Sequence, residues 1–314
     1  MDMNPKIVFM GTPDFAVPVL EALQSLKWPI AGVYTAPDRP AGRSRRVRFS
    51  PIKRYALEAG LLVQQPENFR SSYERDRLLE LGPDVLVVAA YGKLLPEKIL
   101  QVASKGAVNV HPSLLPMYRG ATPVPAAILA GDDYTGVSIM LLDEGMDTGP
   151  ILAQKKVPIE KSDTTSLLIT RLFKEGSMLL QEALPLYMEG RIEPRDQDNS
   201  YAVVTNRLTK EDGNIDWSKP AKYIERQIRA YRPWPGSFTH WEGRKLEILS
   251  AQARTSTTLG DVGQIVAAPD GGPPGVITTE GELVLLELKL EGKQNSGIAE
   301  FLRGYPSLVE ARLG

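Results

Sequence analysis

The first 190 residues alternate between short apolar runs and longer stretches with helical spacing. Short apolar runs bounded by Gly or Pro are typical of buried strands, and they occur at residues 6–10, 31–35, 61–64, 84–90, 107–111, 135–142 and 151–157. Capping residues and helical apolar spacing predict helices at residues 14–26, 51–60, 71–82, 97–103, 123–130 and 162–188. Ser50 is the predicted cap of the second of these helices, and Ser71 with Glu74 forms a predicted capping box for the third. This alternation predicts an α/β fold with a doubly wound, mostly parallel (Rossmann-like) sheet.

The pattern changes after residue 190. Residues 191–205 are polar, and we place a linker at residues 191–208 between a first domain, 1–190, and a second domain, 209–314. The second domain has one long helical pattern, at residues 220–231. Short strand patterns separated by Gly-containing turns follow at residues 238–241, 245–250, 263–267, 275–279 and 283–290. Several short strands at such spacing predict a smaller antiparallel β-barrel.

Composition narrows the chemistry. The chain has 314 residues, 42% of them hydrophobic and 24% charged, which is enough for two cores. It has no cysteine, so disulfides, thiolate nucleophiles and cysteine-ligated metals are excluded, and with only two histidines we expect no metal site. The net charge of −1 means that local basic patches would have to hold any polyanion. The N-terminal apolar run is too short for a signal peptide, and no run approaches a membrane span, so we expect a cytoplasmic protein.

Polar side chains gather where two of the predicted strands end. Asn109 and His111 are two positions apart at the end of the strand at residues 107–111, so both point to the same side of the sheet. In open α/β sheets the carboxyl edge of the strands is where ligands bind. The strand at residues 135–142 leads into a Gly-rich turn that contains Asp147, our third candidate. An amide, an imidazole and a carboxylate together suit a reaction that builds negative charge on a carbonyl oxygen.

The histidines also have a structural interpretation. An isolated histidine at a strand end is more often a structural residue than a catalytic one, and we interpret His240, beside Trp241, as structural. His111 lies among polar residues at a strand end, and we therefore interpret it as the acid/base.

Two basic segments are candidates for phosphate contacts. Residues 37–54 contain seven basic residues and one acid, Asp38, in a stretch where Pro and Gly predict a loop without regular structure for most of its length. In the helix predicted at residues 220–231, Lys222, Arg226 and Arg229 share one face. Both segments have a plainer interpretation as solvated surface, and the helix becomes a candidate for nucleic-acid contact only if it lies beside the first segment.

With these residues in view, the chain resembles the methionyl-tRNA formyltransferases, a branch of the folate-dependent formyltransferases. The resemblance extends over nearly the whole length, and its motifs are residues 11–16, 37–43, 109–111, 113–116, 118–120 and 143–149, with weaker markers at 215–217 and 233–235. Pro112 and Ser44 depart from the pattern, because glycine is common at both positions.

The resemblance implies an OB-like barrel for the second domain, a co-substrate, a partner and site residues. The donor is 10-formyltetrahydrofolate, and the acceptor is the α-amine of initiator methionyl-tRNA. The reaction serves translation initiation, and the enzyme is expected to be a monomer. The catalytic residues are Asn109, His111 and Asp147. The folate contacts are Ser113, Leu114, Leu115, Pro116, Tyr91, Gly92, Leu94 and Asp143. The tRNA contacts are Arg39, Arg43, Arg45, Arg46, Lys222, Arg226 and Arg229, with Arg43 leading.

Three other functions stay open at this point. The motif at residues 109–116 and Asp147 also fit formyltransferases that act on glycinamide ribonucleotide or on an amino-sugar nucleotide. Water in place of the amine would give hydrolysis of the formyl folate. A catalytically inert tRNA-binding protein is the alternative from another class.

Overall fold

The structure is a computed structural model that describes residues 4–41, 46–256, 260–268 and 271–314, without the side chains of residues 40, 41, 46 and 47. The chain divides into two compact units, which are described separately below. The first comprises residues 1–120, 134–158 and 169–205, and the second comprises residues 121–133, 159–168 and 206–314. No helix within the described ranges is long and apolar enough to cross a membrane.

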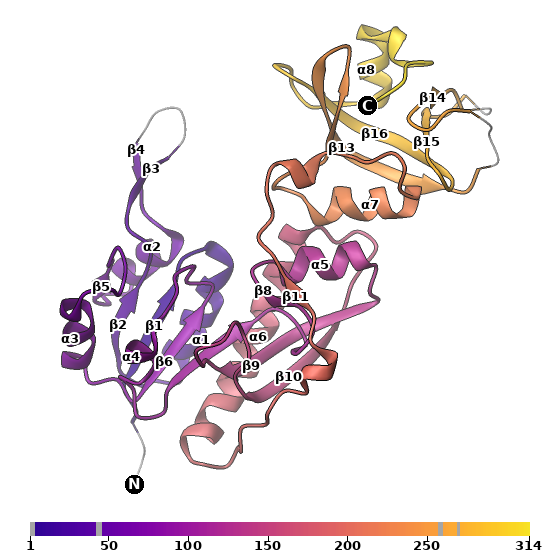
Figure 1. Cartoon of the computed structure of the whole chain (residues 1–314). Coiled ribbons are helices and arrows are strands. Elements are labelled where there is room, and N and C mark those ends of the chain that lie inside the picture. The colour runs from indigo at the N-terminus through magenta and orange to yellow at the C-terminus, as the bar shows by residue number, and fades with distance from the viewer. Residues whose placement is uncertain (1–3, 42–45, 257–259, 269–270) are drawn as a thin grey trace. The chain divides into compact units, whose positions relative to one another are not determined.

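The first unit is built on a seven-stranded sheet in the order β10-β9-β7-β6-β1-β2-β5 (Figure 1). The strands from β5 to β7 are parallel, whereas β9 is antiparallel to both of its neighbours. The predicted mostly parallel, doubly wound sheet is therefore confirmed. Its strands are β1 (Ile7–Gly11), β2 (Ile30–Tyr34), β5 (Val63–Gln64), β6 (Val85–Ala89), β7 (Ala107–His111), β9 (Tyr134–Leu141) and β10 (Ile151–Pro158).

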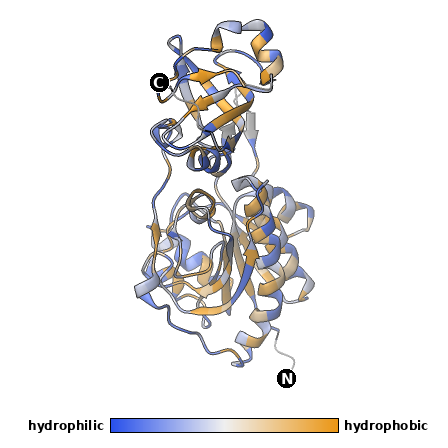
Figure 2. Ribbon diagram, turned by 90° about the vertical axis from the view of Figure 1, so that its right-hand side faces the viewer, coloured by the Kyte–Doolittle hydropathy of each residue, from blue (hydrophilic) through white to orange (hydrophobic). Residues whose placement is uncertain are grey.

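Helices cover both faces of this sheet. One face packs α1, α2 and α6 over a core that includes Phe9, Val87 and Val110, and the other packs α3 and α4 over Met10 and Leu86. The strands at the centre of the sheet are largely apolar in sequence (Figure 2), as expected for strands buried on both sides. The helices are α1 (Val17–Ser25, after the 3₁₀ turn η1, Asp14–Ala16), α2 (Pro51–Glu58), α3 (Ser72–Glu80), α4 (Glu97–Leu100) and α6 (Thr165–Met188).

The order of the strands explains where a ligand can bind. From β1 the chain passes to β2 and β5 on one side, and then to β6 and β7 on the other. The topology therefore switches between β1 and β6, and in such sheets ligands bind beyond the carboxyl ends of the strands. The loops after these strands touch, because the Thr12 hydroxyl donates to the Tyr91 carbonyl oxygen at 3.0 Å.

Two local predictions in the first unit were wrong. The basic segment contains the short antiparallel pair β3 (Arg39–Ala41) and β4 (Arg46–Arg48), where we expected a loop. Pro and Gly signal the turn but do not prevent pairing on either side of it. Ser71 makes no capping hydrogen bond for α3, although its spacing to Glu74 suggests one, whereas Ser50 accepts from the Lys53 amide and caps α2 as predicted.

The second unit packs helices on an antiparallel sheet. Helix α7 (Ala221–Ala230) contacts α5 (Pro123–Ala130), and Ile224 and Ile228 join the core under β13 and β16. The sheet runs β12-β13-β16-β15-β14, with β17 beside β16, and it does not close into a barrel within the described residues. Its elements are β12 (Phe238–Trp241), β13 (Arg244–Arg254), β14 (Ile265–Val266), β15 (Gly275–Ile277), β16 (Glu282–Leu290), β17 (Ser296–Gly297), α8 (Ile298–Gly304) and the 3₁₀ turns η3 (Glu211–Gly213) and η4 (Pro306–Leu308).

The segment that we expected to act as a linker is bound to the first unit up to residue 205. Arg195 forms an isolated antiparallel bridge with Ile151, and β11 (Val204–Thr205) pairs in parallel with β8 (Arg119–Gly120), with the 3₁₀ turn η2 (Asn199–Tyr201) between them. This part of the chain is therefore packed against the sheet rather than free.

Candidate active site

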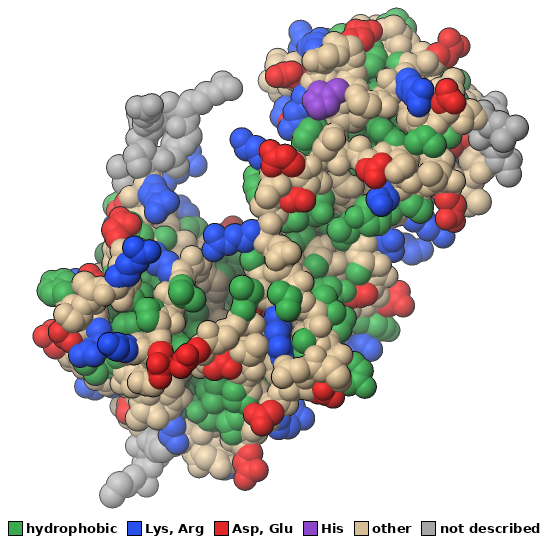
Figure 3. Space-filling view, in the orientation of Figure 1, with side chains coloured by type: hydrophobic (Ala, Val, Ile, Leu, Met, Phe, Trp, Pro, Cys, Tyr) green, Lys and Arg blue, Asp and Glu red, His purple; other side chains and the backbone are tan. Residues whose placement is uncertain are grey.

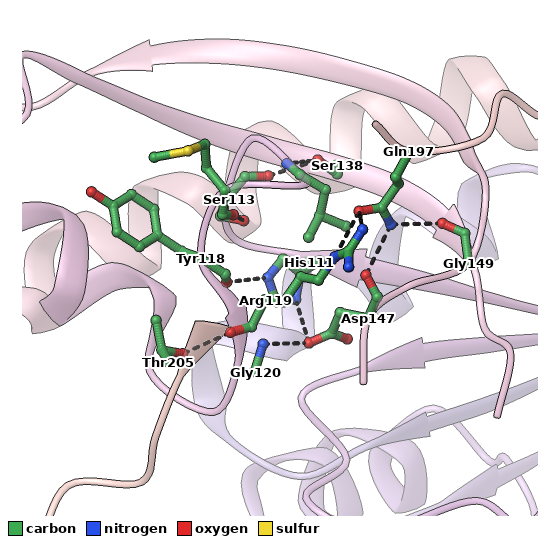
Figure 4. Close-up of polar contacts among 12 residues, drawn as sticks. His111, Ser113, Tyr118, Arg119, Gly120, Ser138, Asp147, Gly149, Gln197 and Thr205 are labelled. Atoms are coloured by element: carbon green, nitrogen blue, oxygen red, sulfur yellow. Dashed lines mark hydrogen bonds and ion pairs between the residues drawn. The ribbon is translucent and has the colours of Figure 1, made fainter. Parts of the chain in front are cut away.

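His111 and Asp147 form an ion pair at the end of β7. The Nδ1 atom of His111 lies 3.6 Å from the Asp147 Oδ2 atom, and the histidine is only 4% exposed. On the other side of the ring, Nε2 donates to the Tyr118 carbonyl oxygen at 3.1 Å, which fixes the ring (Figure 4). Because a carbonyl oxygen can only accept, Nε2 carries a hydrogen and Nδ1 is the atom that gains or loses a proton.

Asp147 is held in a specific backbone conformation. Its φ is +54°, which is uncommon for a residue other than glycine, and its carboxylate accepts from the Gly120 amide at 2.8 Å. The 3.6 Å separation from His111 is longer than a normal hydrogen bond, so the carboxylate makes no full hydrogen bond with Nδ1. Nδ1 therefore remains available to bond a third group.

Asn109 lies on the same side of β7 as His111. Val108 and Val110 point into the core under α6, so the alternate positions 109 and 111 face the other side of the sheet. Asn109 is half-buried, and its side-chain amide makes no hydrogen bond to another described residue. The predicted trio is therefore together on one face of the sheet, with an amide donor free for a ligand.

Hydrogen bonds from side chains of β9 and β10 hold the loop after His111 in place. The buried Ser138 hydroxyl accepts from the Leu115 amide and donates to the Ser113 carbonyl oxygen, and the Gln154 amide donates to the Leu115 carbonyl oxygen at 2.9 Å. The Ser113 hydroxyl donates to the Met117 carbonyl oxygen at 2.6 Å. Ser113 and Leu115 are buried, whereas Leu114 and Pro116 are half-buried, so the predicted folate segment offers a ligand mainly its backbone and these two side chains.

The other predicted folate contacts differ in accessibility. Leu94 is 87% exposed, and Gly92 is exposed with a φ of +78°. Tyr91 is 2% exposed and its ring packs against Phe69, so this residue offers a ligand almost no accessible surface. The Asp143 carboxylate accepts from the Thr148 hydroxyl at 2.7 Å and thereby holds its own loop.

Sequence analysis missed Gln197, which contacts the backbone of the Asp147 loop. The Gln197 amide nitrogen donates to the carbonyl oxygens of Asp147 at 2.8 Å and Gly149 at 2.7 Å, and the buried Arg119 donates to its amide oxygen (Figure 4). Gln197 lies in a polar stretch with no periodicity, so no local pattern marks it.

The basic segment is only partly described. Arg39 is exposed and pairs with Arg48 across β3 and β4, while Arg46 is placed by its backbone alone. Arg43 and Arg45 lie outside the described residues. At the base of the segment, Asp38 accepts hydrogen bonds from Lys53 and Gln65, and the bond from Lys53, followed by that from Gln65, lowers the pKa of the Asp38 carboxyl.

The basic residues of α7 are engaged with backbone oxygens. Arg226 donates to the Ala130 carbonyl oxygen at 3.1 Å, and Arg229 donates to the Asp163 carbonyl oxygen at 2.9 Å, whereas Lys222 is exposed. Burial lowers the pKa of Arg229. Positive and negative side chains are interspersed on the visible face of each unit (Figure 3).

No group of three or more metal-ligating side chains occurs in the part of the chain that the structure describes. At the end of β7, an amide, an imidazole and a carboxylate lie on one face and form a candidate proton-transfer site. It can stabilise an oxyanion and move a proton without a covalent enzyme intermediate.

Comparisons with known proteins agree with this chemistry. The formyl transferase family matches residues 5–184, and the formyl transferase C-terminal domain family matches residues 207–306. The methionyl-tRNA formyltransferase of Chloroflexus aggregans is 47% identical over 299 residues, which is 95% of this chain and 97% of that protein.

Two solved structures share the fold. The N-formyltransferase of Helicobacter canadensis, in complex with folinic acid and dTDP-3-aminofucose, has a TM-score of 0.67 at 18% identity and covers 90% of this chain and 99% of its own. HypX of Aquifex aeolicus, in complex with tetrahydrofolic acid, has a TM-score of 0.63 at 16% identity and covers 98% of this chain and 48% of its own.

The fold, the proton-transfer site and the two domain matches define a formyl transferase. Within that class, the chain belongs to the methionyl-tRNA formyltransferase family, which the identity over nearly its whole length shows. The resemblance described from the motifs is therefore confirmed.

Proposed function

We propose that this protein transfers a formyl group from 10-formyltetrahydrofolate to the α-amine of methionine esterified to initiator tRNA. The observation that carries the proposal is the convergence of Asn109, His111 and Asp147 on one face of the sheet, in a chain whose relatives are named for this activity. We further propose that it works as a cytoplasmic monomer in translation initiation.

Each member of the trio has a distinct role. The donor supplies an electrophilic formyl carbon, and attack by the amine places negative charge on the formyl oxygen. Asn109 donates one hydrogen bond to that oxygen, and the Nδ1–H of protonated His111 donates a second. Asp147 stabilises the charged imidazole and accepts the proton that the attacking amine releases, directly or through water, before it passes to the departing nitrogen of the folate.

The residues around the trio suit a planar, partly apolar donor. Leu94 and Met146 are 87% and 61% exposed on the loops after β6 and β9. Exposed side chains of this size are available to cover a ring system, and the backbone of the fastened segment at residues 113–116 offers polar contacts. These groups would hold the folate, while the trio acts on the formyl group.

The basic segment supplies the contacts to the acceptor. Arg39 is exposed on β3, and with Arg43, Arg45 and Arg46 it would bind phosphates of the acceptor stem. We expect Arg43→Ala to weaken the use of tRNA more than the use of folate, and tRNA affinity to fall steeply with salt. Salt-independent binding of tRNA would contradict phosphate contacts of this kind.

One assay tests the function against its alternatives. The purified protein is given 10-formyltetrahydrofolate with initiator methionyl-tRNA, with free methionine or with no acceptor. We expect formyl-methionyl-tRNA only in the first reaction and little tetrahydrofolate without an acceptor. Release of formate without tRNA would indicate a hydrolase, and formylation of glycinamide ribonucleotide or an amino-sugar nucleotide in preference to tRNA would replace the proposed acceptor.

A further inference from the structure

The three residues Tyr118, Arg119 and Gly120 contact every part of the catalytic pair. The Tyr118 carbonyl oxygen accepts from His111, the Gly120 amide donates to the Asp147 carboxylate, and the Arg119 guanidinium binds Gln197. This short segment therefore contacts the His111 ring, the Asp147 carboxylate and Gln197, which in turn bonds to the Asp147 backbone.

Gln197 has all of its amide hydrogen-bonding capacity in use. Its Oε1 accepts from Arg119 Nε at 3.0 Å and Nη2 at 2.8 Å. Its Nε2 donates to Asp147 at 2.8 Å and to Gly149 at 2.7 Å. Because a guanidinium only donates and a carbonyl oxygen only accepts, these partners allow one orientation of the amide.

Arg119 is itself immobilised. It is 6% exposed, and its Nη2 also donates to the Asn199 side-chain oxygen at 2.8 Å. Its carbonyl oxygen accepts from the Thr205 hydroxyl at 2.9 Å. Gln197 is therefore held by a buried arginine that makes several hydrogen bonds, and from this position it bonds to the Asp147 loop (Figure 4).

The Asp147 loop needs such support. Residues 143–146 are exposed, and Asp147 adopts a φ of +54°, a conformation that is unfavourable for a residue with a Cβ. The Gln197 bonds hold the carbonyl groups on both sides of Thr148. A small rotation there would move the carboxylate away from His111.

We propose that Gln197, oriented by Arg119, is a positioning residue that sets the His111–Asp147 geometry. This inference rests on the proposed function, because it assumes that the pair carries the proton transfer. Gln197 touches neither the reacting atoms nor His111, and acts only through the backbone of Asp147 and Gly149.

The decisive variant is Gln197→Glu, which keeps the length and the acceptor for Arg119. It replaces the Nε2 donor by an oxygen that faces two carbonyl oxygens, so the grip on the loop becomes a repulsion. We expect kcat for formyl transfer to fall roughly 10- to 100-fold, with KM for the folate changed less than about threefold, because small misplacements of catalytic groups cost rates of this size. Asp198→Asn is the matched control, since the side chain of that exposed residue bonds, among the described residues, only to Ser200.

The two histidines allow a readout that does not depend on activity. In a ¹⁵N-histidine-labelled sample, His111 and His240 give separate ring signals, which a His240→Gln variant assigns. We expect Gln197→Glu to shift the ring ¹⁵N signals of His111 and leave those of the exposed His240 in place. If the Gln197 bonds served stability alone, Gln197→Glu would lower the melting temperature without shifting the His111 signals.

The outcomes separate this inference from the proposed function. A reduced kcat with shifted His111 signals supports the positioning role. Unchanged kcat in Gln197→Glu, or reduced kcat with unshifted His111 signals, overturns it. If Asp147→Asn is as active as the wild type, the proposed function of the pair fails instead, whatever the Gln197 variant does.

Discussion

The end of β7 and the basic face of α7 use polar side chains in opposite ways. At β7, the Asn109 side chain has no hydrogen bond to a described residue, and the His111–Asp147 pair is 3.6 Å apart with capacity left for a third group. On α7, Arg226 and Arg229 each donate to a carbonyl oxygen of the same compact unit. We propose that the first set acts on a ligand, whereas the two arginines of the second set contribute contacts within the fold.

The difference comes from what each element packs against. A strand has two faces, so a spacing of two residues fixes which side chains share a face before any tertiary contact forms. The environment of a helix face is not determined by spacing alone, because α5 or a loop can pack against it and form hydrogen bonds with its charged side chains. Charge on a helix therefore indicates function only after its neighbours are known.

Asp147→Asn should give the largest effect and tests the β7 side of this contrast. The amide keeps the size of the carboxylate but neither stabilises a charged His111 nor accepts a proton, so turnover should fall on the order of 10²- to 10⁴-fold. Steady-state formyl transfer measures it. Glu144→Gln, an exposed carboxylate in the same loop, is the control and should stay within a few-fold of the wild type.

Asn109→Ala should come next in size. Removal of one donor to a developing oxyanion costs on the order of 10²- to 10³-fold in turnover, while folate binding should survive. Turnover and folate affinity are measured on the same preparation, with Asn214→Ala, an exposed asparagine in the second unit, as control. Normal turnover would remove Asn109 from the list of donors.

Arg229→Ala and Lys222→Ala test the α7 side. Loss of Arg229 leaves the Asp163 carbonyl oxygen without this donor, so the free energy of unfolding should drop by about 1–3 kcal/mol. Lys222 is exposed, and its removal should cost less than about 0.5 kcal/mol. Urea titration compares the two variants. Equal stability would mean that the arginine is a free ligand-binding group after all.

Asp38→Asn should give a smaller effect than Arg229→Ala, with a defined pH dependence. The bonds from Lys53 and Gln65 lower the pKa of Asp38 below the unfolded value of about 3.9, so their stabilisation is fully present above that pH. It is lost as the pH falls through the folded pKa. The variant should be destabilised by less than about 1 kcal/mol at pH 7, and the difference should vanish in acid. A pH-independent difference would argue against this origin.

The sequence predicted the sheet and its strand-end trio well, for reasons that are local. The run at residues 84–90 is continuous enough to mark a buried strand, and the alternation at Asn109 and His111 fixes their common face. Helix α8 was missed although Ile298 and Phe301 have helical spacing, because the segment is short.

The remainder depended on contacts between distant residues. Gln197 reaches Asp147 across 50 positions, and nothing in its polar surroundings shows which loop it will meet. The absence of a capping hydrogen bond from Ser71 and the antiparallel pairing of β3 with β4 likewise depend on how neighbouring segments pack. The open edge of the second sheet, which we expected to close, is of the same kind.

A single-turnover experiment with His111→Asn tests the central claim most directly. The enzyme is saturated with 10-formyltetrahydrofolate and mixed with initiator methionyl-tRNA, and the formyl transfer step is followed by rapid quench beside a folate-binding titration. The account predicts a rate at least about a hundredfold below the wild type with folate affinity within a few-fold. A wild-type transfer rate in this variant would contradict it.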